Sequence, residues 1–204
     1  MMTKSDLHLK IKEVLRQRKP KSIQVTDTHY RHAGVLVPLF RDSGEYNVLF
    51  TKRTNRVEHH KGQVSFPGGR VDDEDGSMEE TALRETHEEI GLPRDEVTIL
   101  GRTDDMVTLT SSFIVHPFVG LIPYPYDFRI STGEVKRLVR VPLEIFFSDN
   151  ASYYKKEVIE VNGTIYPGPA YEYQEDVIWG ATARIMENFI EIIEEKLRLS
   201  QAEQ

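Results

Sequence analysis

The chain has 204 residues, a length that suits one domain with room for a hydrophobic core. Its hydrophobic fraction of 39% and charged fraction of 29% are ordinary for a globular protein, and its net charge of −7 argues against broad binding to nucleic acids or membrane surfaces. Cysteine is absent, which excludes disulfides and thiolate nucleophiles. The sequence has neither an apolar run near the roughly 20 residues of a membrane span nor a signal-peptide pattern, so the cytoplasm is the default expectation.

The first third of the chain predicts one helix and three strands. Within residues 1–20, the segment 5–18 has apolar residues at helical spacing, so we expect an amphipathic helix. This helix is expected to pack on the domain or to serve as a dimer arm, which leaves a homodimer open. Residues 33–40 predict a buried strand, residues 46–52 its hairpin partner, and residues 63–66 a short strand.

The stretch 66–92 combines a Gly-Gly turn, an acidic loop and a helix rich in carboxylates. Ser77 is a suitable N-cap, and Glu80 three residues later completes a capping box, so the helix is expected to start near Met78. Gly91 supplies the left-handed residue that ends it.

Three carboxylates share one side of this helix, because Glu85, Glu88 and Glu89 stand at positions i, i+3 and i+4. Like charges this close repel unless a cation neutralises them, and hard oxygen ligands suit Mg²⁺ or Mn²⁺. The alternative is an acidic face that only meets solvent. The metal site is favoured because the opposite face is apolar enough to pack on a core, and because the preceding Gly68-Gly69 turn brings backbone groups close to whatever the carboxylates bind. That apolar face consists of Ala82, Leu83, Thr86 and Ile90.

Further strands and a terminal helix are predicted beyond this point. Strands are expected over 97–100 and 113–121, the latter with Pro117 at an edge or a bulge, and a hairpin is expected to turn at Asn162-Gly163. Residues 180–199 have the spacing of a helix, and the preceding tryptophan, Trp179, is expected in the core.

The segment 84–92, RETHEEIGL, resembles the second half of the Nudix box, G-x5-E-x7-R-E-U-x-E-E-x-G-U, in which U is a bulky apolar residue. Every fixed position matches, and Thr86 is a mild departure at the first apolar position. The first half departs more, because Gly76 stands where the box has a glutamate and Gly69 lies one residue too far upstream. A one-residue insertion in the loop restores the glycine and puts Asp75 in the acidic position.

A second resemblance covers residues before and after the box. The signature of the coenzyme A pyrophosphatase branch of Nudix hydrolases is similar to Phe50-Thr51-Lys52-Arg53-Thr54, then His60, Gly62, Val64 and Phe66-Pro67-Gly68-Gly69. That branch carries the same extra residue in the loop after its two glycines. The segments 133–143 and 178–183 also resemble it, whereas Glu58 departs from the Arg that the branch generally has there.

The resemblance implies one Nudix hydrolase domain over residues 1–204, an α/β fold arranged as an α/β/α sandwich around a mixed β-sheet. The residues implied as metal ligands are Glu85, Glu88, Glu89 and the carbonyl of Gly69. Arg84 is expected to orient a glutamate through an ion pair. Glu85 and Glu134 are both candidates for the general base, although Glu134 also fits a surface acid at the start of a strand.

The implied reaction is hydrolysis of the diphosphate bond of coenzyme A or acyl-CoA to 3′,5′-ADP and (acyl-)4′-phosphopantetheine, with Mg²⁺ or Mn²⁺. The local positive charge over 52–61 suits phosphate oxygens, although such cations also fit a solvated strand edge. The expected substrate-binding residues are Arg53, Arg56, His60, Lys61 and Gly68; His60 equally fits a loop cap. Another nucleoside diphosphate, such as ADP-ribose or a dinucleotide, fits the box as well. A catalytically silent nucleotide-binding module is a more remote alternative, since all three helix acids are present.

Overall fold

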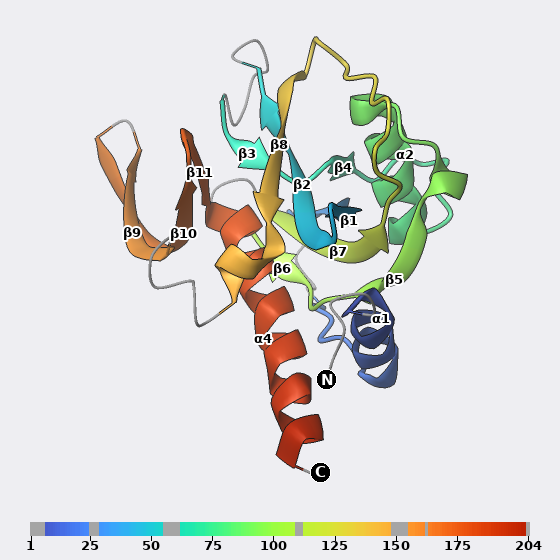
Figure 1. Ribbon diagram of the computed structural model, residues 1–204. Coiled ribbons are helices and arrows are strands. Elements are labelled where there is room, and N and C mark those ends of the chain that lie inside the picture. Colours follow the sequence, from blue (N-terminus) through green and yellow to red (C-terminus); the bar gives the residue numbers. More distant parts are fainter. Residues whose placement is uncertain are drawn as a thin grey trace.

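The computed structural model describes residues 7–24, 29–54, 62–108, 112–147, 155–161 and 163–202. It contains an eight-stranded sheet flanked by helices and a three-stranded sheet beside it (Figure 1). The larger sheet has parallel and antiparallel pairs, which confirms the expected α/β fold with a mixed sheet. In the part of the chain that is described, no helix is long and apolar enough to cross a membrane.

The centre of the larger sheet consists of β1 (Arg31–Asp42), β2 (Glu45–Arg53) and β7 (Phe113–Leu121). β1 and β2 form the predicted hairpin, whose turn at Ser43-Gly44 takes positive φ angles of 50° and 92°. On its other side, β1 runs parallel to β7 along nearly its whole length. These strands are long apolar runs because both of their faces are covered.

β7 is an inner strand, because β1 lies on one side of it and β5 (Thr98–Arg102) and β6 (Met106–Val107) lie on the other. Of the two expectations for Pro117, the edge was wrong, whereas the pairing beside it is irregular: residues 103–105 stand opposite residues 116–117 of β7. Pro117 faces the interval between β5 and β6, where its carbonyl accepts a hydrogen bond from the Thr103 N–H at 3.2 Å. The N–H that proline lacks falls on the same side, so neither strand loses a ladder bond.

β1 and β2 pair with each other only near their shared turn and then separate. β3 (Val64–Ser65) pairs with β2, and β4 (Gly68–Arg70) pairs with β1, so together they fill the opening. β8 (Val135–Pro142) pairs with β2 on its outer side. The Gly-Gly turn is thus held within the sheet as β4.

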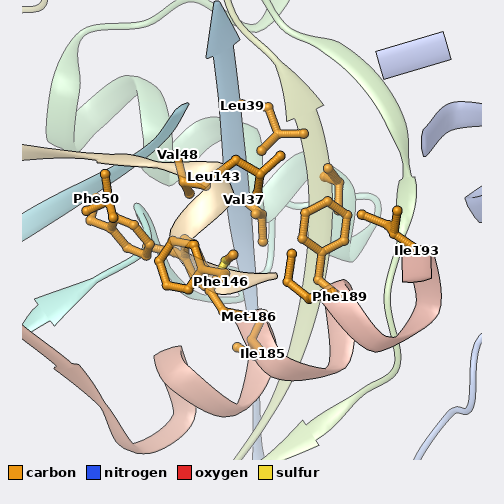
Figure 2. Packing of buried hydrophobic residues seen from close by; sticks show 14 of the residues in the cluster. Val37, Leu39, Val48, Phe50, Leu143, Phe146, Ile185, Met186, Phe189 and Ile193 are labelled. Carbon is orange, nitrogen blue, oxygen red and sulfur yellow. The ribbon is translucent and has the colours of Figure 1, made fainter. Parts of the chain in front are cut away.

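Among the described residues, three α-helices cover the larger sheet: α1 (Leu7–Gln17), α2 (Met78–Ile90) and α4 (Gly180–Ala202). α2 packs on the face of β1 that carries Leu36 and Phe40, whereas α1 and α4 pack on the face that carries Val37 and Leu39. Alternate residues of a strand point to opposite faces, which gives two separate hydrophobic clusters. In Figure 2, side chains of α4 such as Phe189 lie beside those of the strands. This layering is the predicted α/β/α arrangement.

The smaller sheet has the order β11 (Asp176–Trp179), β10 (Thr164–Tyr173), β9 (Lys155–Val161), and β9 and β10 are the predicted hairpin. The described part of the chain also contains the 3-10 helices η2 (Arg94–Glu96) and η3 (Leu143–Phe146). Trp179 is only partly buried and lies outside both hydrophobic clusters, so its expected core position was wrong.

Candidate active site

The limits of α2 follow from its caps, as predicted. The Ser77 hydroxyl accepts a hydrogen bond from the Glu80 N–H at 3.1 Å, and Gly91 takes a left-handed φ of 69° while its N–H donates to the His87 carbonyl at 2.8 Å. In a standard capping box the Glu80 carboxylate would accept from the N–H of the N-cap residue, Ser77. Here it accepts from the Gly76 N–H at 2.9 Å and so ties the acidic loop to the helix.

The three glutamates on α2 lie in different environments. The Glu89 side chain is 4% exposed and that of Glu85 19%, whereas that of Glu88 is 58% exposed. Only Glu85 and Glu89 therefore turn inward toward β4, and Glu88 stands at the rim.

Two glycines of β4 allow its backbone to lie against these carboxylates. A Cβ added at Gly69 would lie 2.5 Å from the Glu85 carboxylate, closer than any side chain can be. The Gly68 N–H, at a φ of 146°, hydrogen-bonds the Glu89 carboxylate. Glu85 and Glu89 are thus placed by direct contact with the Gly-Gly turn.

Glu89 is a buried carboxylate with little compensation. Burial, together with the nearby charges of Glu134 and Glu85, raises its pKa to about 8, against the opposing charge of Arg53. The Arg53 Nη1 lies 3.5 Å from the Glu89 Oε1, while the Glu89 Oε2 and the Arg53 Nε are buried with no hydrogen-bond partner in the described structure. Burial also raises the pKa of Glu85. The carboxylates of Glu85 and Glu89 are thus buried without enough positive charge to offset them, an environment that suits a bound cation.

Arg84 connects the acidic loop to the helix. Its Nε and Nη2 donate to both carboxylate oxygens of Asp75 at 2.9 Å, and its Nη1 donates to Glu85 at 2.9 Å and to Glu88 at 3.2 Å. The hydrogen bonds from Arg84 hold the pKa of Asp75 well below its usual range. The expected ion pair to a glutamate is present, and the two-pronged contact to Asp75 accompanies it.

Glu134 reaches the site through the connection between β7 and β8. The Ser131 N–H donates to the Glu89 carbonyl at 2.8 Å, and the Glu134 N–H donates to the Ser131 carbonyl at 3.0 Å. Thr54, at the end of β2, donates from its N–H to the Glu134 carbonyl at 2.8 Å and from its hydroxyl to the Gly133 carbonyl at 2.9 Å. Glu134 is exposed, yet its charge contributes to the raised pKa of Glu85 and Glu89.

Sequence reasoning missed the roles of Thr54 and Ser131 in this arrangement. Thr54 belongs to the segment that resembles the coenzyme A pyrophosphatase signature, so the sequence could have indicated a role for it, whereas nothing in the sequence distinguishes Ser131. Gly34 was also missed. A Cβ there would lie 2.3 Å from the Met78 carbonyl oxygen, so Gly34 lets α2 approach the sheet, and an isolated glycine within a strand is the signal for such an approach.

The remaining predicted residues divide into two groups. Arg56, His60 and Lys61, together with Glu58, lie outside the described residues. Lys52 is described, and its Nζ forms a 2.7 Å ion pair with Asp176 of β11. Its charge is therefore committed to a contact within the protein.

A divalent ion would find hard oxygen donors in Glu85, Glu89 and the carbonyl of Gly69, with Glu88 at the rim. The described part of the chain contains no group of three His, Asp or Glu side chains close enough to hold a metal by themselves. Arg84 forms ion pairs with both Glu85 and Glu88 in this structure. The donor chemistry fits Mg²⁺ or Mn²⁺, but the carboxylates must reorient to share one ion.

Residues 30–160 match the sequence profile of the NUDIX domain. The chain belongs to the Nudix family. A protein of Photorhabdus laumondii named as an uncharacterized Nudix hydrolase NudL is 35% identical over 172 residues, which cover 83% of this chain and 88% of that protein. A protein of the same name from Enterobacter sp. strain 638 is 37% identical over 156 residues, covering 76% and 79%.

Solved Nudix structures share the fold at low sequence identity. A MutT/nudix family protein from Enterococcus faecalis is 12% identical, with a TM-score of 0.55 over 94% of this chain and 73% of that one. A MutT protein from Methanosarcina mazei Go1 is 19% identical, with a TM-score of 0.51 over 86% and 99%. As a Nudix hydrolase, the chain acts on pyrophosphate bonds of nucleoside diphosphate derivatives, a reaction for which this family uses divalent metal ions.

Proposed function

We propose that this Nudix hydrolase cleaves the diphosphate bond of coenzyme A or an acyl-CoA, giving 3′,5′-ADP and (acyl-)4′-phosphopantetheine, with Mg²⁺ or Mn²⁺ as the metal. The support comes from the position of the segment that carries the coenzyme A signature. The Arg53 N–H donates to the Gln63 carbonyl at 2.9 Å, so this segment both leaves and re-enters the fold beside Glu89. Arg53 and Gln63, the two ends of the stretch that contains the cations Arg56 and Lys61 in sequence, thus meet beside a candidate metal ligand.

The 3′-phosphate is the group that distinguishes coenzyme A from most nucleoside diphosphates. Its two negative charges need cations besides those that bind the diphosphate. Lys52 is engaged by Asp176 at 2.7 Å, so we assign this role to Arg53, whose contact with Glu89 is longer at 3.5 Å, and to the cations of the segment 55–61. We assign substrate binding to Arg53, Arg56, His60 and Lys61, with Gly68 contributing its backbone.

The assigned metal ligands are Glu85, Glu88, Glu89 and the carbonyl of Gly69. A bound divalent ion would neutralise phosphate oxygens and lower the pKa of the attacking water. Arg84 keeps Glu85 in place by holding it together with Asp75. Glu85 and Glu134 remain the two candidates for the general base, since both carboxylates lie near Glu89.

The alternative substrate is another nucleoside diphosphate, such as ADP-ribose or a dinucleotide. The observation that favours it is the commitment of Lys52 to Asp176, which lowers the positive charge available to a 3′-phosphate. The more remote alternative is a silent binding module. The two inward-facing carboxylates argue against that alternative, as does the buried Glu89 Oε2, which has no hydrogen-bond partner among the described residues.

The experiment is an activity screen of the purified protein with coenzyme A, dephospho-coenzyme A, ADP-ribose and NADH, each with Mg²⁺ and with Mn²⁺. We expect coenzyme A to have the highest kcat/KM, by about tenfold or more over its dephospho form, because a lost charged contact costs at least 1.4 kcal/mol. Product analysis should show 3′,5′-ADP. Equal turnover of both forms, or a preference for ADP-ribose, would overturn the coenzyme A assignment while leaving the Nudix chemistry intact.

A further inference from the structure

β9 is the outer strand of the three-stranded sheet in the structure as described. Figure 1 shows β9 and β10 projecting from the body of the molecule, on the side away from α1 and α2. An outer strand presents N–H and C=O groups that can pair with another strand.

The register of the hairpin identifies which residues of β9 present these groups. Val158 stands opposite Pro167, which has no N–H, so this pair is not hydrogen-bonded within the hairpin. The N–H and C=O of Val158 therefore point to the outer edge. Because strand geometry repeats every two residues, those of Lys156 and Glu160 point the same way.

The side chains along this edge are complementary to a copy of themselves. In an antiparallel pair of two β9 strands centred on Val158, Lys156 of each copy stands opposite Glu160 of the other. The outward backbone groups of these three residues then form the hydrogen-bonded pairs of the new ladder. We propose that the protein forms a homodimer through this antiparallel pairing of β9 with β9 of a second copy.

Exposed apolar surface gathers on the same hairpin. Val158 is 53% exposed and Ile165 68%, and among the described residues Leu9 is the other large hydrophobic side chain at the surface. Ile165 stands opposite Glu160, so it shares the face of Val158. Pairing through β9 brings the two copies of Val158 into direct contact and covers part of this surface.

A different reading is that the charges on β9 guard the edge against pairing, as charges on outer strands often do. Guarding requires that the charges repel an incoming copy. Here the opposite signs of Lys156 and Glu160 attract in the antiparallel arrangement. Lys156 also lies 3.7 Å from Glu172 of its own chain, but both side chains are more than half exposed and this surface pair holds Lys156 weakly.

The dimer arm suggested by the N-terminal helix has less support. The apolar stripe of α1 (Ile11, Val14 and Leu15) is buried in the core of its own chain. On the described surface of that helix, Leu9 is the one large hydrophobic side chain that is exposed, at 55%, and its sequence neighbours His8 and Lys10 are polar, whereas β9 offers a backbone edge.

Sedimentation equilibrium from low micromolar to near-millimolar protein tests the proposal. We expect the wild type to show a monomer–dimer equilibrium. Lys156→Glu and Glu160→Lys should each raise the dimer dissociation constant about tenfold, since two attractive pairs per dimer become repulsive. The double variant K156E/E160K should restore the wild-type constant. Arg41→Glu makes the same charge change at an exposed site on the β1–β2 hairpin and should leave the constant unaltered.

Val158→Pro supplies a test that does not depend on charge. It removes an N–H that only the second copy would use, so the variant should be monomeric while it keeps its activity. The proposal is overturned if the wild type stays monomeric over the whole range. It is also overturned if single and double charge variants dimerise as the wild type does.

Discussion

Glu89 and Arg84 lie five residues apart along α2 and are stabilised in different ways. Arg84 has a carboxylate at each of its donors, whereas Glu89 is buried beside one distant guanidinium. Substituting Arg84 therefore removes contacts that exist in the metal-free protein. Substituting Glu89 removes a charge whose partner is the proposed metal.

Glu89→Gln should keep the fold and lower kcat by several orders of magnitude. The glutamine preserves the shape of a side chain whose pKa is raised to about 8, so the free energy of unfolding should change little, while the hard anionic ligand is lost. Steady-state kinetics and thermal unfolding of the same preparation measure both quantities. Survival of activity would refute the assignment of Glu89 as a metal ligand.

Arg84→Lys should reduce kcat by about tenfold or more, because one ammonium group cannot reproduce the fork that holds Asp75 and Glu85 together. The matched control is Arg94→Lys, since Arg94 makes a single 3.4 Å contact with Glu80 and its side chain is 67% exposed. The kcat of each variant relative to wild type measures whether the loss is specific to Arg84. Equal effects would mean that Arg84 contributes only surface charge.

At the scale of elements, the end of β2 and the turn before β8 form one unit. Thr54 bonds to both Gly133 and Glu134, and Ser131 bonds to the last turn of α2. Removing one of these bonds should therefore displace Glu134 from the carboxylates of α2. It should do so without emptying any part of the hydrophobic core.

Thr54→Val tests this link, because valine has the same shape but no hydroxyl to donate to the Gly133 carbonyl. We expect kcat to fall by about threefold to tenfold with little change in KM, since one hydrogen bond contributes about 0.5–1.5 kcal/mol. Thr54→Ser restores the donor and should recover most of the loss. If serine and valine variants behave alike, the hydroxyl has no positioning role.

The sequence predicted elements whose signals are local. The cap residues Ser77 and Gly91 bound α2 as expected, because each acts on the backbone of its own helix. Contacts between distant segments were not predictable in this way. Gly34 is far from α2 in sequence, and Ser131 follows Glu89 by a long connection, so periodicity carries no record of their meeting.

The unequal burial of the three glutamates also could not be predicted from the sequence. Helical spacing puts Glu85, Glu88 and Glu89 on one side, but the direction of that side depends on how α2 rests on β1 and β4. Whether Pro117 marks an edge or an irregular inner position could not be decided from the sequence for a related reason. Strand order depends on which segments pair, and a proline is tolerated inside a sheet where its neighbour strand is interrupted.

At the scale of the whole molecule, ion pairs join the two sheets. Asp176 of β11 accepts from Lys52 of β2 at 2.7 Å and from Arg137 of β8 at 2.7 Å, and its side chain is almost fully buried. Burial alone would raise the pKa of Asp176, but the hydrogen bonds from Lys52 and Arg137 outweigh it and lower the pKa from its ordinary 3.8. The stability of the whole fold is thereby linked to pH.

A lowered carboxyl pKa stabilises the fold above the unfolded pKa near 4, and this contribution is lost as the pH falls through the folded value. Asp176→Asn should therefore lower the free energy of unfolding at pH 7 by about 1–3 kcal/mol, and the difference from wild type should shrink toward pH 3. Urea unfolding across this pH range measures it. Glu175→Gln is the control, since Glu175 contacts the same Arg137 from an exposed position and should have little effect. A difference independent of pH would contradict the linkage.

The separation of β1 and β2 has a consequence for how substrate preference can evolve. β3 pairs directly with β2, and the Arg53 N–H donates to the Gln63 carbonyl. The segment between Arg53 and Gln63 is therefore anchored at both ends by backbone contacts that do not depend on its side chains. Doubling the length of such a segment costs only about 0.6 kcal/mol in closure entropy. Insertions and exchanges there can therefore accumulate without disturbing Glu85 or Glu89. Grafting this segment between relatives should transfer a substrate preference while the hydrolytic machinery stays unchanged.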